Sequence, residues 1–358
     1  MAELNSEMTR LMDLAVSRGS SDILLSVGTT PTLRLMGVLT PLTEEFPVLL
    51  PDVAQAMILP LMTDAQIAKL EEYREFDFSY AEPTGKGRFR INVFYQRGYL
   101  SAALRLIPTE VSNLRDLNLP VILERYTRAS QGLFLITGPA GHGKTTTLAA
   151  LVEMINQTRS EHIITVEDPI EFIFTNKKSL IEQREVHRDT LSFEDALIAV
   201  LRQDPNVVLI GEMRDQPTTE AGLTIAETGH LVLASIHTNN AAQAADRIIS
   251  IFPSAQQDQA KTVLANTLLG VISQRLVPRA DGKGRIPAVE IMTATAAVKN
   301  LIREGKTFLL PNTIATSTEE GMISMDRALS ELVKRGDITY ESAEAWATDP
   351  KTLAKLIY

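Results

Sequence analysis

The sequence contains no cysteine among its 358 residues. This absence excludes disulfide bonds, zinc sites with cysteine ligands and thiol catalysis, and it fits a reducing compartment. The sequence also lacks a long apolar run, and its first residues carry acidic side chains. The pattern therefore predicts neither a membrane-spanning helix nor a signal peptide. We expect a cytoplasmic protein.

Positive charge is scarce in the chain as a whole. Lysine and arginine number 35 against 44 aspartates and glutamates, which gives a formal net charge of −9. Nucleic-acid-binding proteins usually carry an excess of basic residues, so the composition argues against that class but leaves a local basic groove open. Hydrophobic residues make up 44% of the chain, which is enough for a sizeable core, and the length favours two domains.

A glycine-rich stretch near the middle of the chain carries the strongest chemical signal. Residues 138–145 read GPAGHGKT, the P-loop pattern, between an apolar run and a helix-forming run. The pattern predicts a strand, a loop whose N–H groups surround phosphate oxygens, and a helix whose N-terminus adds partial positive charge. Lys144 would reach the β- and γ-phosphates of ATP, and Thr145 would ligate Mg²⁺. The predicted nucleotide-binding residues of this stretch are Gly138, Pro139, Ala140, Gly141, His142, Gly143, Lys144, Thr145 and Thr146.

The residues after position 130 predict an α/β domain. Four apolar runs alternate with helical stretches, as expected for strands buried on both faces of a parallel sheet. These runs lie at 133–137, 163–166, 207–210 and 231–236. Helical patterns follow Met292, at 294–303, 324–335 and 340–347.

The N-terminal part of the chain has a different pattern, which predicts a small α+β domain with a mixed or antiparallel sheet. Apolar spacing and alternation predict three helices and four strands there. The helices are expected at 3–18, 51–58 and 63–72, and the strands at 23–27, 32–36, 88–95 and 99–107. A turn-prone connector follows, so the domain division that we predict is 1–107, a linker at 108–120, an ATPase domain at 121–291 and a helical region at 292–358.

Two acidic residues follow predicted strands of the second domain. Glu167 ends the second strand, where a carboxylate can orient or deprotonate the attacking water or hold Mg²⁺ through water, although a solvated turn is the alternative. Glu212 follows the apolar run at 207–210, which is the Walker B pattern. Its carboxylate would contact Mg²⁺ or the catalytic water.

Histidines and arginines complete the candidate site. His237 ends the fourth strand, close to where a γ-phosphate would lie, and could sense that phosphate. His230 begins the same strand, so a metal shared by the two rings is disfavoured, and His230 could cap a helix. An arginine often stabilises phosphoryl transfer, but the sequence does not identify which one would do so. The candidates are Arg88, Arg90, Arg97, Arg105, Arg202, Arg214 and Arg247.

Several motifs, taken in order, resemble those of the secretion-type ATPases, and specifically the branch that retracts type IV pili. They are Ser21-Asp22, GRFRIN at 87–92, the P-loop, ITVEDPIEF at 164–172, QREVHRDT at 183–190, LRQDPNVVLIGEMRD at 201–215, the histidine box at 228–238 and KNLIRE at 299–304. Assembly ATPases of this superfamily usually carry a four-cysteine zinc insertion, which this chain lacks. Three departures are His142, where the family commonly has Ser or Thr, Asn206, where it has Asp, and the motif at 299–304, which is preceded by Ala297-Val298 and differs slightly from the usual one. The His142 side chain should point off the loop.

The resemblance implies a homohexameric motor with a PAS-like N-terminal domain, a RecA-like P-loop ATPase core and a helical C-terminal tail. ATP would sit between the two domains. The resemblance further implies Glu167 as the catalytic acid, Glu212 as the Walker B acid, and Arg90 and Arg105 as arginines that close on the phosphates. The implied cofactors are ATP and Mg²⁺. The implied partner is the pilus platform protein at the cytoplasmic face of the inner membrane, which closure of the domains would turn.

Other functions stay open at this stage. An accessory retraction ATPase, or an assembly or secretion ATPase, would carry many of the same motifs. A scaffold with little turnover is disfavoured because both acids, Lys144 and Thr145 are present, and a nucleic-acid translocase is disfavoured by the net negative charge. We expect the side chains of Lys144, Glu167, Glu212 and His237 to converge on one pocket.

Overall fold

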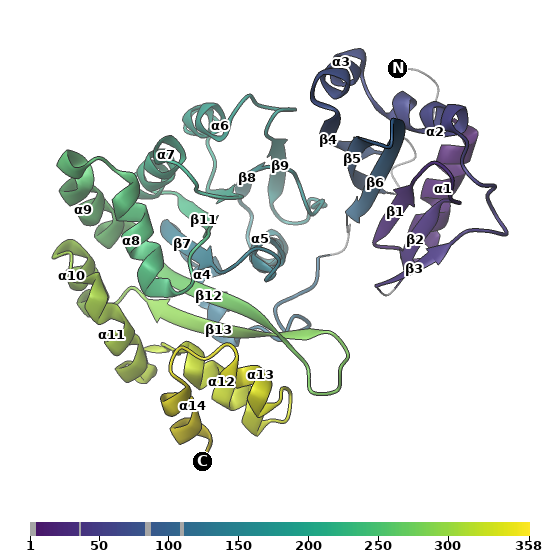
Figure 1. Cartoon of the computed structure of the whole chain (residues 1–358). Coiled ribbons are helices and arrows are strands. Elements are labelled where there is room, and N and C mark those ends of the chain that lie inside the picture. Colours follow the sequence, from purple (N-terminus) through teal and green to yellow (C-terminus); the bar gives the residue numbers. More distant parts are fainter. Residues whose placement is uncertain (1–4, 36, 83–86, 108–110) are drawn as a thin grey trace. The chain divides into compact units, whose positions relative to one another are not determined.

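The computed structural model describes residues 5–35, 37–82, 87–107 and 111–358, and Figure 1 shows its elements. The chain forms two compact units. The first comprises Met1–Glu110 and Pro169–Ile173, and the second comprises Val111–Asp168 and Phe174–Tyr358. Each unit has a hydrophobic core of its own. The domain boundaries expected from the sequence stay a prediction, and no sequence pattern indicated that 169–173 would join the first unit.

The first unit is an α+β unit built on one antiparallel sheet. Its six strands are ordered β3-β2-β1-β6-β5-β4. The strands are β1 (Asp22–Leu25), β2 (Thr32–Leu35), β3 (Val38–Pro41), β4 (Glu75–Ala81), β5 (Arg88–Gln96) and β6 (Tyr99–Ile107), and the helices are α1 (Ser6–Ser17), α2 (Pro51–Ile58), the 3-10 turn η1 (Leu59–Leu61) and α3 (Asp64–Tyr73).

Alternation along β5 gives this sheet two different faces. Phe89, Ile91 and Val93 are fully buried in a core shared with α1 and α2, whereas Arg88 and Arg90 point to the opposite face and are half-buried. The polar face of the sheet therefore carries the arginines that the sequence singled out.

Local signals placed most elements of this unit correctly. The capping box of Thr63 and Gln66 is present at the start of α3, and the Asn5 side chain caps α1. Strands β3 and β4 were not expected. Parts of three expected segments, at 3–4, 36 and 108–110, lie outside the described residues.

The second unit is an α/β fold around a seven-stranded sheet. The order is β13-β12-β7-β11-β10-β8-β9, and only β13 pairs antiparallel to its neighbour. The strands are β7 (Gly132–Thr137), β8 (His162–Glu167), β9 (Leu180–Glu185), β10 (Val207–Ile210), β11 (Leu231–Ile236), β12 (Leu268–Pro278) and β13 (Arg285–Thr293). The four runs predicted from the sequence are the central strands of this sheet.

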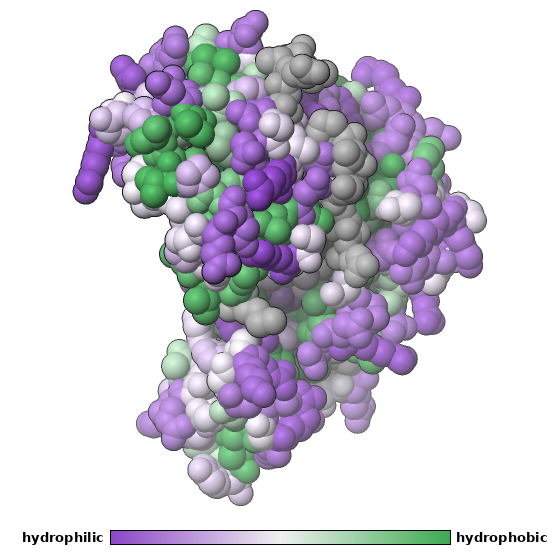
Figure 2. All heavy atoms as spheres, turned by 90° about the vertical axis from the view of Figure 1, so that its right-hand side faces the viewer, coloured by the Kyte–Doolittle hydropathy of each residue, from purple (hydrophilic) through white to green (hydrophobic). Residues whose placement is uncertain are grey.

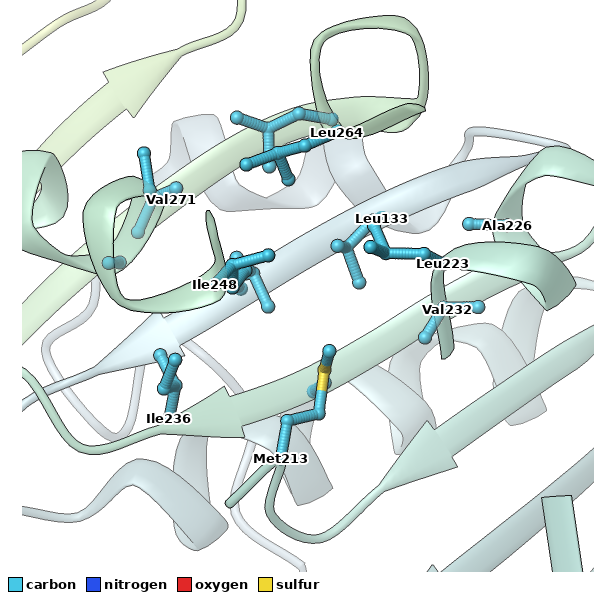
Figure 3. Packing of buried hydrophobic residues seen from close by; sticks show 14 of the residues in the cluster. Leu133, Met213, Leu223, Ala226, Val232, Ile236, Ile248, Leu264 and Val271 are labelled. Carbon is cyan, nitrogen blue, oxygen red and sulfur yellow. The ribbon is translucent and has the colours of Figure 1, made fainter. Parts of the chain in front are cut away.

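Helices pack on both faces of the central strands. The short η2 (Val121–Leu123) and α4 (Glu124–Thr127) precede β7, and α5 (Lys144–Thr158) covers one face, where Leu148, Leu151 and Ile155 are buried against β7 and β11. Figure 3 shows the core on the other face, where Leu223 and Ile248 lie beside Leu133 and Val232. The helical elements of that face are α6 (Phe193–Val200), α7 (Gln216–Glu227), α8 (Ala241–Ile251), η3 (Ser254–Gln256), α9 (Gln257–Thr267), α10 (Ala296–Arg303), η4 (Thr307–Leu309) and α11 (Leu310–Thr316).

The C-terminal helices form a small bundle against the β12–β13 hairpin. The elements are η5 (Thr318–Glu320), α12 (Met325–Lys334), α13 (Tyr340–Glu344) and α14 (Pro350–Ile357). Leu329, Leu353 and Ile286 meet in its core. The sequence predicted α12 and α13 but neither strand of the hairpin, so it left unspecified the surface on which the helices pack.

The fold class expected from the sequence, an α/β P-loop core with an N-terminal α+β domain and a helical tail, is confirmed. No helix among the described residues combines the length and apolar character that a membrane span needs. On the face that Figure 2 shows, hydrophilic residues predominate and apolar residues form separate patches.

Candidate nucleotide-binding site

The predicted P-loop lies between β7 and α5, as the strand–loop–helix pattern requires. Gly138, Gly141 and Gly143 have φ angles of 145°, 75° and 80°, a region that other residues rarely adopt. At Gly138 a Cβ atom would lie 2.4 Å from the carbonyl oxygen of Gln274. Gly143 is the N-cap of α5 and offers no capping side chain. The first N–H groups of α5 are therefore not capped by a side chain at that position, which suits an anion.

Lys144 lies at the start of α5 and is 7% exposed. Its Nζ donates to the carbonyl oxygens of Gly138 and Pro139, at 2.9 and 3.0 Å. Nζ also lies 3.2 Å from Nδ1 of His237. The ammonium group is thus bound to the loop itself, at the position where a phosphate could replace these carbonyl oxygens.

A chain of polar side chains leads from Lys144 across the carboxyl edge of the sheet. His237 Nε2 lies 3.1 Å from Glu212 Oε1, and Arg214 donates to Glu212 Oε2 at 2.7 Å. The pKa of Arg214 is raised, chiefly by the hydrogen bond to Glu212. Burial acts in the opposite direction, and the negative charges of Glu212 and Asp168 add to the increase. Glu212 is thereby held between two basic side chains.

The strand order explains why a histidine occupies the middle of this chain. β11 lies between the P-loop strand β7 and the Walker B strand β10. His237 follows β11 directly, so its ring spans the gap between Lys144 and Glu212. We call the connected side chains of Lys144, His237, Glu212 and Arg214 the edge array.

Glu167 lies at the carboxyl end of β8, the strand next to β10, and is 5% exposed. Its carboxylate accepts hydrogen bonds from Thr165 Oγ1 at 2.6 Å and from Gln183 Nε2 at 3.2 Å. Gly211 allows the close approach of the two strand ends, because a Cβ there would lie 3.3 Å from the Cα of Glu167. Glu167 and Glu212 therefore follow adjacent strands, while the Glu167 carboxylate contacts residues of its own strand and of β9.

The candidate ligands of Mg²⁺ are few. Thr145 is half-buried at the start of α5, and its hydroxyl forms no hydrogen bond with another described residue. Within the described part of the chain, no group of three or more histidine or acidic side chains could hold a metal ion by itself. One hydroxyl and one carboxylate fit Mg²⁺, which keeps several waters and takes oxygen ligands from substrate phosphates.

The structure adds residues that the sequence analysis missed. Gln274 of β12 is 2% exposed, donates to the carbonyl of His142 at 2.8 Å and accepts from the Thr147 hydroxyl at 2.8 Å. The hydroxyl of Thr137, at the end of β7, donates to the carbonyl of Thr238, accepts from the Thr238 N–H and contacts the Thr238 hydroxyl. A polar residue inside an apolar strand could have indicated Gln274, but only after β12 had been recognised.

Two of the histidines outside the edge array, His142 and His230, have different environments. The Nδ1 of His142 accepts from the N–H of Leu276 at 2.9 Å, so the side chain points off the loop as expected. His230 Nδ1 lies 3.0 Å from the carbonyl of Ile225 near the end of α7, which places it at a helix terminus. His230 and His237 therefore lie at opposite ends of β11.

Three arginines of the first unit lie in a row across the polar face of its sheet. The cross-strand partners are Arg34 with Asp22, Asp22 with Arg105, and Arg105 with Arg90. Directly opposite residues share a face of the sheet. Asp22 contacts Arg34 at 3.2 Å and Arg105 at 3.1 Å, whereas Arg90 forms no ion pair with another described residue. We call Arg34, Arg105 and Arg90 the arginine row; it carries three positive charges against one negative charge.

Known proteins resemble this chain over most of its length. Residues 100–338 match the family described as Type II/IV secretion system protein. The chain belongs to this family. The chain is accordingly a secretion-type ATPase, as its P-loop and Walker B strand indicated.

Individual members of the family match over nearly the whole chain. The type IV pilus retraction ATPase PilT of Pseudomonas aeruginosa is 41% identical, with 96% of this chain and 99% of the relative covered. The twitching motility protein of Neisseria gonorrhoeae is 41% identical over 91% of this chain and 86% of the relative, and the type IV pilus ATPase PilU of P. aeruginosa is 39% identical over 98% and 91%.

Among solved structures, the pilus retraction motor PilT with bound ADP has a TM-score of 0.89 and 44% identity, covering 99% of this chain and all (100%) of that chain. The ATPase DotB of Legionella pneumophila, at 24% identity and a TM-score of 0.78, shares the fold. The resemblance to the pilus-retraction branch that the motifs indicated is confirmed.

Proposed function

We propose that this chain is the motor ATPase that drives retraction of type IV pili. The observation that carries the proposal is the edge array beside a P-loop, in a chain whose full-length relatives include the retraction ATPase of P. aeruginosa. A loop that binds phosphates, a lysine and an acid held within reach of it are the parts that ATP hydrolysis requires.

The residues of the second unit have distinct roles in this mechanism. N–H groups of 138–146 bind the phosphates, and Lys144 exchanges the carbonyls of Gly138 and Pro139 for β- and γ-phosphate oxygens. Glu167 orients and deprotonates the attacking water from its buried position. His237, between Lys144 and Glu212, reports the presence of the γ-phosphate to the Walker B strand.

Mg²⁺ would be held by the Thr145 hydroxyl and, through water, by Glu212, and it would neutralise charge on the phosphate oxygens. Release of Glu212 from His237 or Arg214 would free carboxylate oxygens for that purpose. The ion pairs of Glu212 thus keep it in place before nucleotide binds.

Arg90 and Arg105 supply positive charge to the transferred phosphoryl group. They face each other across β5 and β6, and like charges in that arrangement repel, so an anion between them is favourable. We further propose a homohexamer at the cytoplasmic face of the inner membrane, whose cycle of binding and hydrolysis turns the pilus platform protein. Membership of the secretion-type ATPase family supports the homohexamer and its action on the platform protein.

A deletion strain tests the function. Complementation with the wild-type gene should restore twitching and remove excess surface pili, and complementation with Lys144→Ala should not. Full rescue by Lys144→Ala would contradict the mechanism, and bald cells after deletion would indicate an assembly ATPase.

An accessory retraction ATPase is the second candidate, because the PilU relative is nearly as similar as PilT. The two differ in self-sufficiency. If this chain is the primary motor, it restores twitching in a strain that lacks every other retraction ATPase. If it is an accessory, it does so only when another retraction ATPase is present.

A further inference from the structure

The P-loop is in contact with the C-terminal bundle through the only tryptophan in the sequence. Trp346 follows α13 and packs against the bundle core. Its ring lies edge-on to the His142 ring, with centroids 5.3 Å apart and an angle of 73° between the planes. Edge-to-face aromatic contacts in this distance range are attractive and directional. A residue of the C-terminal bundle therefore touches the phosphate-binding loop directly.

Arg275 of β12 connects the same tryptophan to the other side of the site. Its guanidinium carbon lies 5.2 Å from the Trp346 ring centroid, and its Nη2 donates to the carbonyl of Asn239 at 3.1 Å. Asn239 lies in the turn after β11, two residues beyond His237. A cation over an indole face is a favourable contact, so the Arg275 side chain is held on both sides.

Consecutive residues of β12 bind the loop and the turn at once. Gln274 donates to the carbonyl of His142, Arg275 binds Asn239, and the N–H of Leu276 donates to the His142 ring. The adjacent Arg285 of β13 donates to the carbonyl of Gly141 at 3.3 Å. The loop before Lys144 and the turn after His237 are thus both bound to β12. The Trp346 ring packs against His142 and Arg275 at this place.

We propose that Trp346 and Arg275 are positioning residues that couple the C-terminal bundle to phosphate binding. By contacting His142 and Asn239, they hold the P-loop and the His237 turn at the separation that a bound nucleotide needs. The inference rests on the proposed ATPase function, because it concerns the same loop. It adds that movement of the C-terminal bundle changes nucleotide affinity, and that nucleotide changes the environment of Trp346.

Two measurements test this coupling. Since Trp346 is the sole tryptophan, its fluorescence reports on this contact alone. Titration with ADP should change the emission of Trp346, with half-saturation at the ADP concentration that calorimetry gives for binding. Emission that stays constant while calorimetry detects bound ADP would overturn the proposal.

Kinetics supply the second measurement. Trp346→Ala and Arg275→Met should raise the KM for ATP about fivefold or more while kcat changes less, given the strength of aromatic and cation–π contacts. Trp346→Phe should restore most of the affinity, because it keeps an aromatic ring at the site. His142→Ser combined with Trp346→Ala should weaken binding by less than the sum of the two single effects, because both changes remove the same ring contact.

A matched control separates positioning from stability. Leu353 is fully buried in the bundle core and takes no part in the ring contacts and hydrogen bonds that join Trp346 and β12 to the loop, so Leu353→Ala should lower Tm and leave the KM for ATP nearly unchanged. If Trp346→Ala lowers Tm like Leu353→Ala but leaves KM unchanged, the tryptophan is only structural and the proposal is wrong. A wild-type chain that binds ADP with a change in Trp346 emission but hydrolyses no ATP would refute the proposed function and leave this coupling intact.

Discussion

The two charged regions of this protein handle their charges in opposite ways. In the edge array each charge has a partner of opposite sign or a ring nitrogen, and Lys144 and Glu212 are largely shielded from solvent. In the arginine row, Arg34 and Arg105 share the one carboxylate of Asp22, Arg90 forms no ion pair with another described residue, and the Arg105 side chain is 72% exposed. The charges of the edge array are therefore paired within it, whereas the arginine row keeps an excess of positive charge.

The difference follows from how far each region is exposed to water. Buried charges must be paired, so the P-loop site has to supply its own partners whenever no nucleotide is bound. Exposed arginines face water and can remain in excess until an anion arrives. The edge array therefore needs no ligand to balance its charges, whereas the arginine row keeps an excess of positive charge that an anion could neutralise.

The largest expected effect is at the P-loop end of the edge array. Lys144→Ala should abolish detectable ATP hydrolysis, because no other described side chain is bound to both loop carbonyls. Steady-state phosphate release measures this. Lys178→Ala is the matched control, since Lys178 is exposed and should keep wild-type activity. Equal loss in both variants would mean that the effect is not specific to the site.

The arginine row should come second. Arg90→Ala and Arg105→Ala should each lower kcat by about 10³ if they act on the transferred phosphoryl group, with a smaller change in ADP affinity. Arg10→Ala removes a largely exposed charge of the same unit that contacts Glu7 and the Phe46 ring, and it should leave kcat unchanged. Wild-type turnover in Arg90→Ala would show that the row is merely a solvated face and would remove the contrast between the regions.

The two acids can be distinguished by effects of a similar order. Glu167→Gln should lower kcat by about 10²–10⁴ and leave nucleotide affinity nearly unchanged, as expected for a base that acts on water. Glu212→Gln should in addition weaken the dependence of binding on Mg²⁺. Glu182→Gln is a control, because that side chain is 57% exposed and contacts His162. Identical profiles for the two acids would contradict the separate roles.

The smallest effect concerns stability and pH. Glu290 of β13 accepts from the N–H groups of Ala241 in α8 and Met325 in α12, and burial raises its pKa above the ordinary value of 4.5. An acid whose pKa is raised binds its proton more tightly in the folded chain than in the unfolded chain. Its contribution to the free energy of unfolding is therefore complete below pH 4.5 and is lost as pH rises through the folded pKa.

The free energy of unfolding, measured in denaturant from about pH 5 to pH 8, should therefore fall with pH more steeply in the wild type than in Glu290→Gln. Glu331→Gln on α12, where the side chain is 55% exposed, should leave the slope unchanged. Parallel curves for wild type and Glu290→Gln would show that Glu290 does not titrate with folding.

Local pattern was sufficient for much of the fold and for the P-loop. The strand–glycine–helix order places Lys144 at the start of α5 through contacts within a few residues. Long apolar runs identified β7, β8, β10 and β11, since each is buried on both faces. β9 and β12–β13 escaped prediction because they lie toward the edges of the sheet and mix polar with apolar residues.

The sequence alone therefore determined which residues could bind phosphate and which acids follow a strand. Only the tertiary structure decided that His237 joins Lys144 to Glu212, that Gln274 fastens the loop, and that Arg90 faces Arg105. Those contacts depend on strand order and register, which bring together residues that are far apart in the sequence. Lys144 and His237, for example, are 93 positions apart. No local spacing encodes that arrangement, because it follows from how the strands assemble around a shared core.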